Sequence, residues 1–290
     1  YHHDTLTFSM VYAFSESFML PISHDEVVYG KGSLINKMPG LYDNKFAGVR
    51  GFLAYMLAHP GKKLMFMGSE LGQFDEWNST EQLQWNLLGY EKHRQLNHFF
   101  ATANKFYCDT PAMHENDYDW NGFQWIALDD YKHSIISFRR IAYDGSEVIV
   151  VCNFQPMLRE NYKIGVPKFG IYKEVLNSEA EEFGGCGIVN EGELKAQDAT
   201  DHDLPYSINI TLAPLSVIYI ELDKELPAPE KPKKEKTTNR KAAALKKAKA
   251  EKAAKAESKA EEKVDEKPVV EEKEETKETK AEEKIETVEE

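Results

Sequence analysis

The feature that most constrains this chain is a change in composition near residue 223. Every Phe, Tyr and Trp lies at or before Tyr219, and the 67 residues from Lys224 onward contain no aromatic side chain. That segment carries 19 Lys or Arg and 19 Asp or Glu, so it has little apolar surface to bury. Without such surface, a segment does not offset the conformational entropy that it loses on ordering. We therefore expect residues 223–290 to form a low-complexity Lys/Glu/Ala tail, disordered or transiently helical, after a globular region over 1–222.

Charge and cysteine content exclude several classes of protein. The formal net charge of -13 disfavours a nucleic-acid partner, because phosphate binding needs a basic face. No apolar run reaches the ~18 residues of a membrane span, and the first residues do not have the pattern of a signal peptide. Cys108, Cys152 and Cys186 are too few and too widely spaced for a disulfide framework or a Cys-x-x-Cys zinc site. These features predict a cytoplasmic protein that binds neither nucleic acid nor membrane.

The first 110 residues alternate short apolar runs with helical patterns. Residues 18–22 and 63–67 are typical of buried parallel strands. Between them, residues 43–59 predict a helix with one apolar face, made by Phe46, Val49, Leu53, Met56 and Leu57. A further helix is predicted over residues 90–107. Two β-loop-α units in series indicate a parallel sheet with right-handed crossovers.

After about residue 110 the pattern becomes one of short strands separated by turns. Ile208, Ile210 and Leu212 alternate with polar neighbours, as in a strand with one buried face. We predict strands over residues 123–128, 134–139, 148–154, 172–176, 207–212 and 217–222. This region therefore predicts an antiparallel β-sandwich, which we expect to fold independently of the residues before it.

Two loops that follow the predicted parallel strands carry side chains suited to a sugar ligand. His24, Asp25 and Glu26 follow the first strand, and Trp77 lies in the polar loop after the second. In α/β proteins, binding sites are built at the carboxyl ends of the strands. Aromatic faces pack on pyranose rings, while carboxylates bind the hydroxyls. Spacing alone leaves a structural role open for each loop, either as a helix cap or as a cover over the core.

Several longer motifs occur along the chain in a recognisable order. Residues 23–34, SHDEVVYGKGSL, are followed by PGKKLMFMG at 60–68 and EWN at 76–78, then by GFQWI at 122–126 and VCNFQP at 151–156. Together they closely resemble the glycogen (1,4-α-glucan) branching enzymes of the α-amylase superfamily, across about residues 1–222. The resemblance implies an α/β plus all-β architecture. Residues 1–110 would be the last two βα units of a (β/α)8 TIM barrel, and 111–222 an antiparallel β-sandwich C-terminal domain. It also implies that a longer polypeptide precedes Tyr1, where no initiator Met stands.

The resemblance implies a retaining mechanism with a covalent glucosyl-enzyme intermediate, and no metal or other cofactor. An α-1,4-glucan is cleaved, and the chain is passed to the 6-hydroxyl of a glucan acceptor in glycogen biosynthesis. Of the family's three catalytic carboxylates, only the Asp that stabilises the transition state has a counterpart here, as Asp25. His24 matches the neighbouring substrate-contacting His, and we assign Glu26 and Trp77 to substrate binding. The nucleophile and the acid/base have no match in this chain.

Three positions depart from the family's pattern, and two other functions stay open. Tyr29 stands where a His is common, Gly32 where a Lys is common, and Ser69 where an Asn is common. Because the nucleophile and the acid/base would lie before residue 1, we expect this chain alone to be inactive. One alternative is a non-catalytic α-glucan-binding remnant. The other is an α-amylase-type hydrolase, which would release reducing ends without forming 1,6-linkages.

Overall fold

The amino-terminal part of the fold is a parallel β-α-β unit. The computed structural model describes residues 3–229, and in it β1 (Met19–Ile22) pairs in parallel with β2 (Lys62–Met65). The helix α3 (Tyr42–Ala58) connects these strands, and α4 (Glu91–Asp109) follows them. Two short helices, α1 (His3–Phe8) and α2 (Leu34–Lys37), complete this part. The predicted parallel pair and both predicted helices are confirmed.

The prediction that the two parallel strands are buried is wrong for the part of the chain that the structure describes. Burial alternates along both strands, with Met19 53% exposed and Leu64 39% exposed. Within residues 3–229 no further strand pairs with β1 or β2, so each has a neighbour on one side only. Parallel strands are buried when other elements pack on both faces of their sheet, and a pair of only two strands does not have both faces covered in this way.

The carboxyl-terminal part is an all-β unit of two antiparallel sheets. The larger sheet has the strand order β3-β4-β5-β10-β7-β8, and the smaller pairs β6 with β9. The predicted antiparallel arrangement is confirmed, whereas β6 and β8 were not predicted. The strands are β3 (Phe123–Asp130), β4 (Ile135–Ile141), β5 (Glu147–Asn153), β6 (Arg159–Val166), β7 (Gly170–Asn177), β8 (Leu194–Lys195), β9 (Tyr206–Leu212) and β10 (Val217–Glu225).

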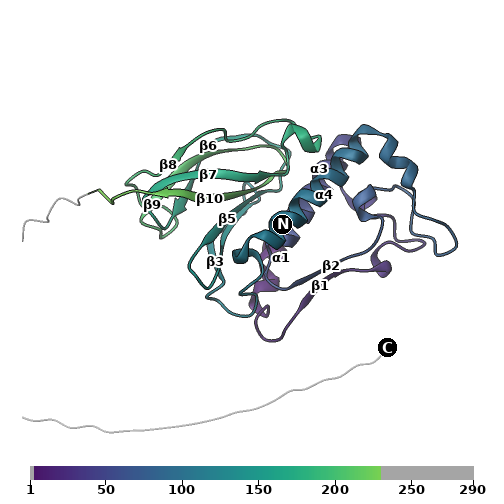
Figure 1. Ribbon diagram of the computed structural model, residues 1–290, viewed down its shortest axis with the longest axis horizontal. Helices are drawn as coiled ribbons and strands as arrows, with labels where there is room; N and C mark the ends of the chain where they lie inside the picture. The colour runs from purple at the N-terminus through teal and green to yellow at the C-terminus, as the bar shows by residue number, and fades with distance from the viewer. Residues whose placement is uncertain (1–2, 230–290) are drawn as a thin grey trace, which may run out of the picture. The chain divides into compact units, whose positions relative to one another are not determined.

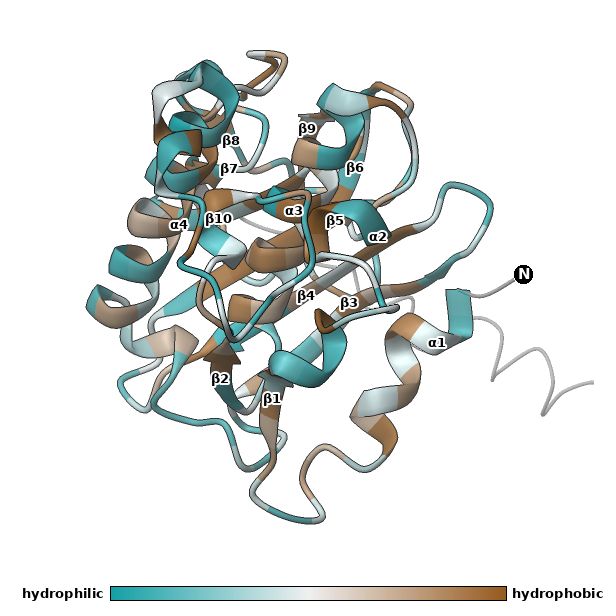
Figure 2. Cartoon of the chain, turned by 90° about the vertical axis from the view of Figure 1, so that its right-hand side faces the viewer, coloured by the Kyte–Doolittle hydropathy of each residue, from teal (hydrophilic) through white to brown (hydrophobic). Residues whose placement is uncertain are grey.

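Both faces of the larger sheet are buried, each in a different core. Alternate residues of β5 divide between them: Val148 and Val150 join the core formed with α3 and α4, while Ile149 and Val151 join the core formed with β6 and β9. Figure 1 shows α3 and α4 between this sheet and the β1–β2 pair. In Figure 2, α3 and the strands behind it are largely coloured as apolar. The helical part is therefore one of the layers that cover the sheet.

One row of α3 is tied to the all-β unit by buried polar contacts at successive turns. The side chain of Arg50 donates from Nε to the carbonyl of Ser178 (2.6 Å) and pairs with Glu179. One turn later the Tyr219 hydroxyl donates to the carbonyl of Ala54, and the Arg140 guanidinium donates to that of Ala58 (2.8 Å). Because these groups have no access to water, each contact must be kept for the two parts to stay together.

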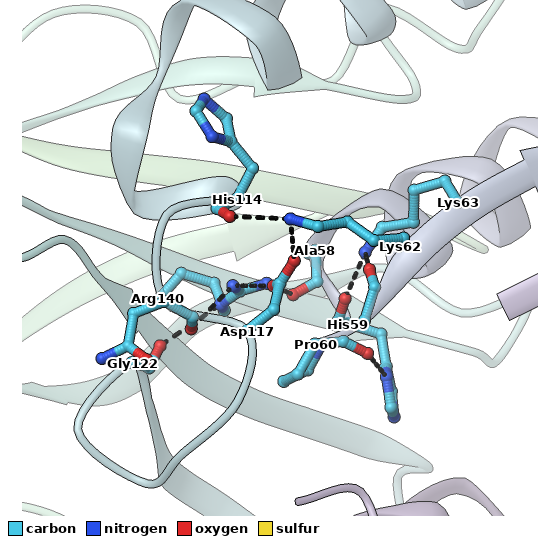
Figure 3. A network of polar contacts seen from close by, with 11 residues as sticks. Ala58, His59, Pro60, Lys62, Lys63, His114, Asp117, Gly122 and Arg140 are labelled. Atoms are coloured by element: carbon cyan, nitrogen blue, oxygen red, sulfur yellow. Dashed lines mark hydrogen bonds and ion pairs between the residues drawn. The ribbon is translucent and has the colours of Figure 1, made fainter. Parts of the chain in front are cut away.

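A buried carboxylate joins β2 to the larger sheet. Asp117 is fully buried, and its Oδ1 accepts a hydrogen bond from Arg140 (2.6 Å) while its Oδ2 accepts one from Lys62 (3.0 Å). Figure 3 shows this network, in which Lys62 also donates to the carbonyl of His114 (3.1 Å). The acid therefore pairs with one cation from each of the two parts that it joins.

His59, at the end of α3, gives the fold a predicted pH dependence. Burial lowers the pKa of His59 to about 4, and its ring nitrogens lie 2.8 Å from the Pro60 carbonyl and 2.8 Å from the Ser9 hydroxyl. The pKa of His59 in the folded protein lies below its value of about 6.5 in the unfolded chain. Neutral His59 therefore contributes to the stability of the fold, fully so at pH values above the unfolded pKa. It is lost as pH falls towards 4. We expect the free energy of unfolding to drop by about 2 kcal/mol between about pH 7.5 and about pH 5.

Urea unfolding at these two pH values measures the effect. The variant His59→Gln should lose most of the drop, whereas the control His98→Gln, at an exposed position on α4, should keep it. Equal pH dependence in wild type and His59→Gln would contradict the assignment.

Candidate functional site

The turn that follows β1 is a 3-10 helix, His24–Glu26, capped by the residue before it. The Ser23 hydroxyl accepts a hydrogen bond from the Asp25 backbone N–H (3.2 Å), and the Glu26 carboxylate accepts two, from the Ser23 N–H (2.6 Å) and the Ser23 hydroxyl (2.9 Å). These bonds form a capping box, which fixes the direction in which the chain leaves the strand. They hold the pKa of Glu26 below its usual range, with the Ser23 hydroxyl as the largest cause.

His24 and Asp25 project from this turn towards solvent. The His24 Nε2 lies 3.3 Å from the Asp25 Oδ1, and the two side chains are 54% and 68% exposed. Glu26, by contrast, is half-buried and hydrogen-bonded within the turn. The carboxylate that can reach a ligand is therefore that of Asp25, while the carboxylate of Glu26 stabilises the backbone beneath it. The substrate-binding role of Glu26 stays a prediction.

The loop after β2 brings Trp77 beside His24. The ring centroids of Trp77 and His24 are 6.1 Å apart in an edge-to-face arrangement, and Phe66 packs edge-on to Trp77 at 5.0 Å. The Trp77 backbone N–H donates to the Val27 carbonyl (2.9 Å), which joins the two loops directly. The structure therefore places all four predicted site residues in loops that follow neighbouring parallel strands.

A second carboxylate, which sequence reasoning did not single out, fastens these loops together. Glu76 accepts hydrogen bonds from the backbone N–H groups of Gly30 (2.9 Å) and Gly32 (2.6 Å). These bonds lower the pKa of Glu76, with the Gly32 N–H as the largest cause. Both glycines have positive φ, 81° and 76°, a conformation that other residues rarely adopt. Glu70, in contrast, accepts a hydrogen bond from the Gly68 N–H of its own loop (2.9 Å).

A groove of about 530 Å³ opens beside Trp77. Its walls come from both loops and include Tyr29, Asp75, Glu76, Asn78 and Glu81. Tyr29 is 93% exposed at the tip of the first loop, and Trp77 is half-buried in the wall of the groove. Aromatic rings beside carboxylate and amide groups suit a neutral ligand rich in hydroxyls.

No metal site and no membrane span were found where the structure is described. Over residues 3–229, no group of three or more His, Cys, Asp or Glu side chains is placed to hold a metal ion. The same residues include no helix that is both long enough and apolar enough to cross a membrane. The predicted tail over 223–290 lies almost entirely outside the described residues.

The chain is similar to known proteins over about three quarters of its length. Residues 125–223 match the family model described as the alpha amylase C-terminal all-beta domain. The 1,4-alpha-glucan branching enzymes GlgB of Aquifex aeolicus and Halothermothrix orenii are each 50% identical over 222 residues, which is 76% of this chain and 35% of each relative. That of Francisella tularensis subsp. novicida is 49% identical over 226 residues, 77% of this chain and 35% of the relative.

The chain thus spans about a third of the length of these curated relatives. Among solved structures, one titled as AmyP in complex with maltose has a TM-score of 0.48 at 12% identity. The match covers 73% of this chain and 41% of the other. The relatives and the family model agree with the sequence motifs. Residues 125–223 therefore belong to the alpha-amylase C-terminal all-beta domain family, and the chain as a whole is related to a part of the 1,4-alpha-glucan branching enzymes.

Proposed function

We propose that this chain supplies the carboxyl-terminal part of a 1,4-α-glucan branching enzyme. Such an enzyme cleaves an α-1,4-glucan and passes the chain to a 6-hydroxyl, which forms an α-1,6 branch during glycogen biosynthesis. The observation that carries this proposal is the His24–Asp25 turn packed beside Trp77, in a chain that is 50% identical to a branching enzyme over 222 residues. We assign residues 1–110 to the last two βα units of a (β/α)8 barrel and residues 111–222 to its C-terminal domain.

Asp25 is the residue to which we assign transition-state stabilisation. Its carboxylate is exposed at the end of β1, while the capping box below it fixes the backbone. A carboxylate held in this way binds sugar hydroxyls. It also stabilises the positive charge that develops as the sugar ring flattens in the transition state. His24 and Trp77 lie beside this carboxylate. His24 supplies a hydrogen-bonding group, and Trp77 supplies an aromatic surface.

In a retaining mechanism, the remaining steps need two further carboxylates. One attacks the anomeric carbon and forms the glycosyl-enzyme ester, while an acid protonates the leaving oxygen. The same acid, now a base, then takes the proton of the acceptor's 6-hydroxyl as that oxygen displaces the ester. We assign neither role to this chain, so we propose that it acts only as part of a longer enzyme.

The substitution Asp25→Asn tests the proposal in the complete polypeptide that carries this sequence. We expect turnover to fall by about 100-fold or more, because one preorganised electrostatic contact to the transition state is lost. The thermal midpoint should stay unchanged, because Asp25 is exposed. New 1,6-linkages, counted after enzymatic debranching, measure the activity. Asp198→Asn, at an exposed carboxylate of the all-β unit, is the matched control. Near-normal turnover in Asp25→Asn would remove the role from Asp25.

A non-catalytic glucan-binding role is the second candidate, favoured by the open groove beside Trp77. The complete polypeptide that carries this sequence distinguishes the two. New 1,6-linkages support the branching function, whereas binding of maltoheptaose without any glycosidic bond formed or broken supports the non-catalytic role. Reducing ends without new 1,6-linkages, from the complete polypeptide, would indicate a hydrolase instead. We place the protein in the cytoplasm, because Cys108, Cys152 and Cys186 are free thiols.

A further inference from the structure

We propose that the groove between Tyr29 and Trp77 is a separate binding position for a glucose ring of an α-glucan, with Tyr29 as its stacking residue. The groove lies next to the His24–Asp25 turn, so the inference rests on the proposed function for its choice of ligand. It goes beyond that function because the function was assigned to His24, Asp25 and Trp77, and Tyr29 is not one of these residues. Tyr29 would thus give this chain a contact that depends on an aromatic ring.

The groove has the size and the walls of a small-ligand site. Its volume of about 530 Å³ falls in the range of a few hundred to about a thousand cubic ångströms that such sites occupy. Tyr29 and Trp77 both line it, so two aromatic residues border one groove. The phenol ring of Tyr29 is 93% exposed, which leaves its faces open to a ligand.

The loop that carries Tyr29 is held in place from below. Its neighbour Gly30 and the next glycine, Gly32, both donate backbone N–H groups to the Glu76 carboxylate (2.9 and 2.6 Å). Two residues before Tyr29, the Val27 carbonyl accepts from the Trp77 N–H (2.9 Å). A loop backbone fixed in this way loses little conformational freedom when the ligand binds, which favours affinity. Glu76 is therefore a positioning residue, because it acts on the ligand through the loop.

The chemistry of the walls selects the class of ligand. Asp75 and Glu81 contribute carboxylates, and Asn78 contributes an amide, while no Lys or Arg lines this groove. Carboxylates accept hydrogen bonds from hydroxyl groups and repel phosphate or carboxylate ligands. An aromatic ring packs on the apolar face of a sugar ring and leaves the hydroxyls at the edge for the acids. A neutral chain of glucose units meets both requirements.

Calorimetric titration of the 290-residue chain with maltoheptaose tests the inference. We expect Tyr29→Ala to raise the Kd about fivefold, because the packed ring is lost, while Tyr29→Phe keeps the wild-type Kd. The matched control is Tyr143→Ala, which removes a 73% exposed Tyr from the all-β unit and should change nothing.

A second variant tests the positioning role of Glu76. In Glu76→Gln the side chain keeps one acceptor oxygen, so one of the two N–H groups of the loop loses its partner. We expect the Kd for maltoheptaose to rise about threefold although Tyr29 is present, on the scale of one lost hydrogen bond. Hydrogen exchange should become faster at Gly30 and Gly32. Unchanged exchange at both glycines would show that Glu76 does not hold the loop.

The outcomes separate this inference from the proposed function. If wild type does not bind maltoheptaose at millimolar concentration, or if Tyr29→Ala binds as tightly as wild type, the inference is overturned. In the latter case, loss of branching in Asp25→Asn would leave the proposed function standing. If Tyr29→Ala weakens binding while Asp25→Asn keeps full branching activity, the glucan site stands and the catalytic assignment fails.

Discussion

A chain that starts at residue 111 is expected to lose cooperative folding, in contrast to the independent folding that its β-sandwich pattern predicts from the sequence. The reason is that removal of α3 and α4 uncovers one whole face of the larger sheet. Six large apolar side chains on that face are at most 1% exposed in the intact fold, namely Phe123, Phe138, Val148, Val150, Val217 and Tyr219. The truncated chain must either expose this surface to water or bury it against another copy of itself.

The magnitude of the effect follows from ordinary transfer energies. Leaving a large apolar side chain in water costs about 2 kcal/mol, so this face represents about 10 kcal/mol or more. A domain is usually stable by only ~5–15 kcal/mol. The truncation also leaves the Arg140 guanidinium without the Ala58 carbonyl and the Tyr219 hydroxyl without the Ala54 carbonyl. These lost partners add to the apolar term, because buried polar groups need them.

Thermal unfolding followed by circular dichroism, together with binding of a hydrophobic dye, measures the result. The matched control is the chain of residues 3–229, which keeps every described element and lacks only the terminal residues. We expect a cooperative transition for the control, and for residues 111–229 a gradual one with strong dye binding. A truncated chain that unfolds cooperatively within about 1 kcal/mol of the control would show that the sheet needs no helical layer.

The sequence contains part of this result. Residues 148–152 are an unbroken apolar run, which is typical of a strand with both faces covered, whereas Ile208, Ile210 and Leu212 alternate as a strand with one covered face does. The structure has this pattern in β5 and β9. What covers the second face of β5 is not a local property. It depends on contacts such as that of Tyr219 with Ala54, 165 residues apart.

The candidate site was also only partly predictable from the sequence. The order of strands and loops places His24 and Trp77 at the ends of neighbouring strands, and the two rings lie 6.1 Å apart in the structure. Glu76 was not predicted as a separate feature, because its partners are backbone N–H groups. Those groups converge on the carboxylate only when Gly30 and Gly32 adopt positive φ. No spacing rule for side chains reports such a contact.

The substitution Asp117→Asn is expected to destabilise the fold by about 3–5 kcal/mol, the usual effect of removing one partner of a buried ion pair. The Asn side chain has nearly the same shape, so packing is kept and charge is what changes. Arg140, also fully buried, then has no carboxylate to neutralise it. The Asn amide group also adds a donor beside the ammonium group of Lys62 or the guanidinium of Arg140.

The variant Lys62→Met shows whether the loss of stability in Asp117→Asn depends on burial of the charged partner or only on its charge. Lys62→Met removes the other cation of Asp117, but Lys62 is 45% exposed and its pairing is partly replaced by water, so we expect a loss of about 1 kcal/mol or less. Urea unfolding measures all of these variants. Wild type, Asp117→Asn, Arg140→Met and the double variant Asp117→Asn/Arg140→Met form a mutant cycle, and Lys62→Met is measured beside them. If burial of the charge is the cause, the double variant loses far less than the two single variants together. Simple additivity would mean that Asp117 and Arg140 stabilise the fold independently, and that the loss in Asp117→Asn does not come from an unpaired buried charge on Arg140.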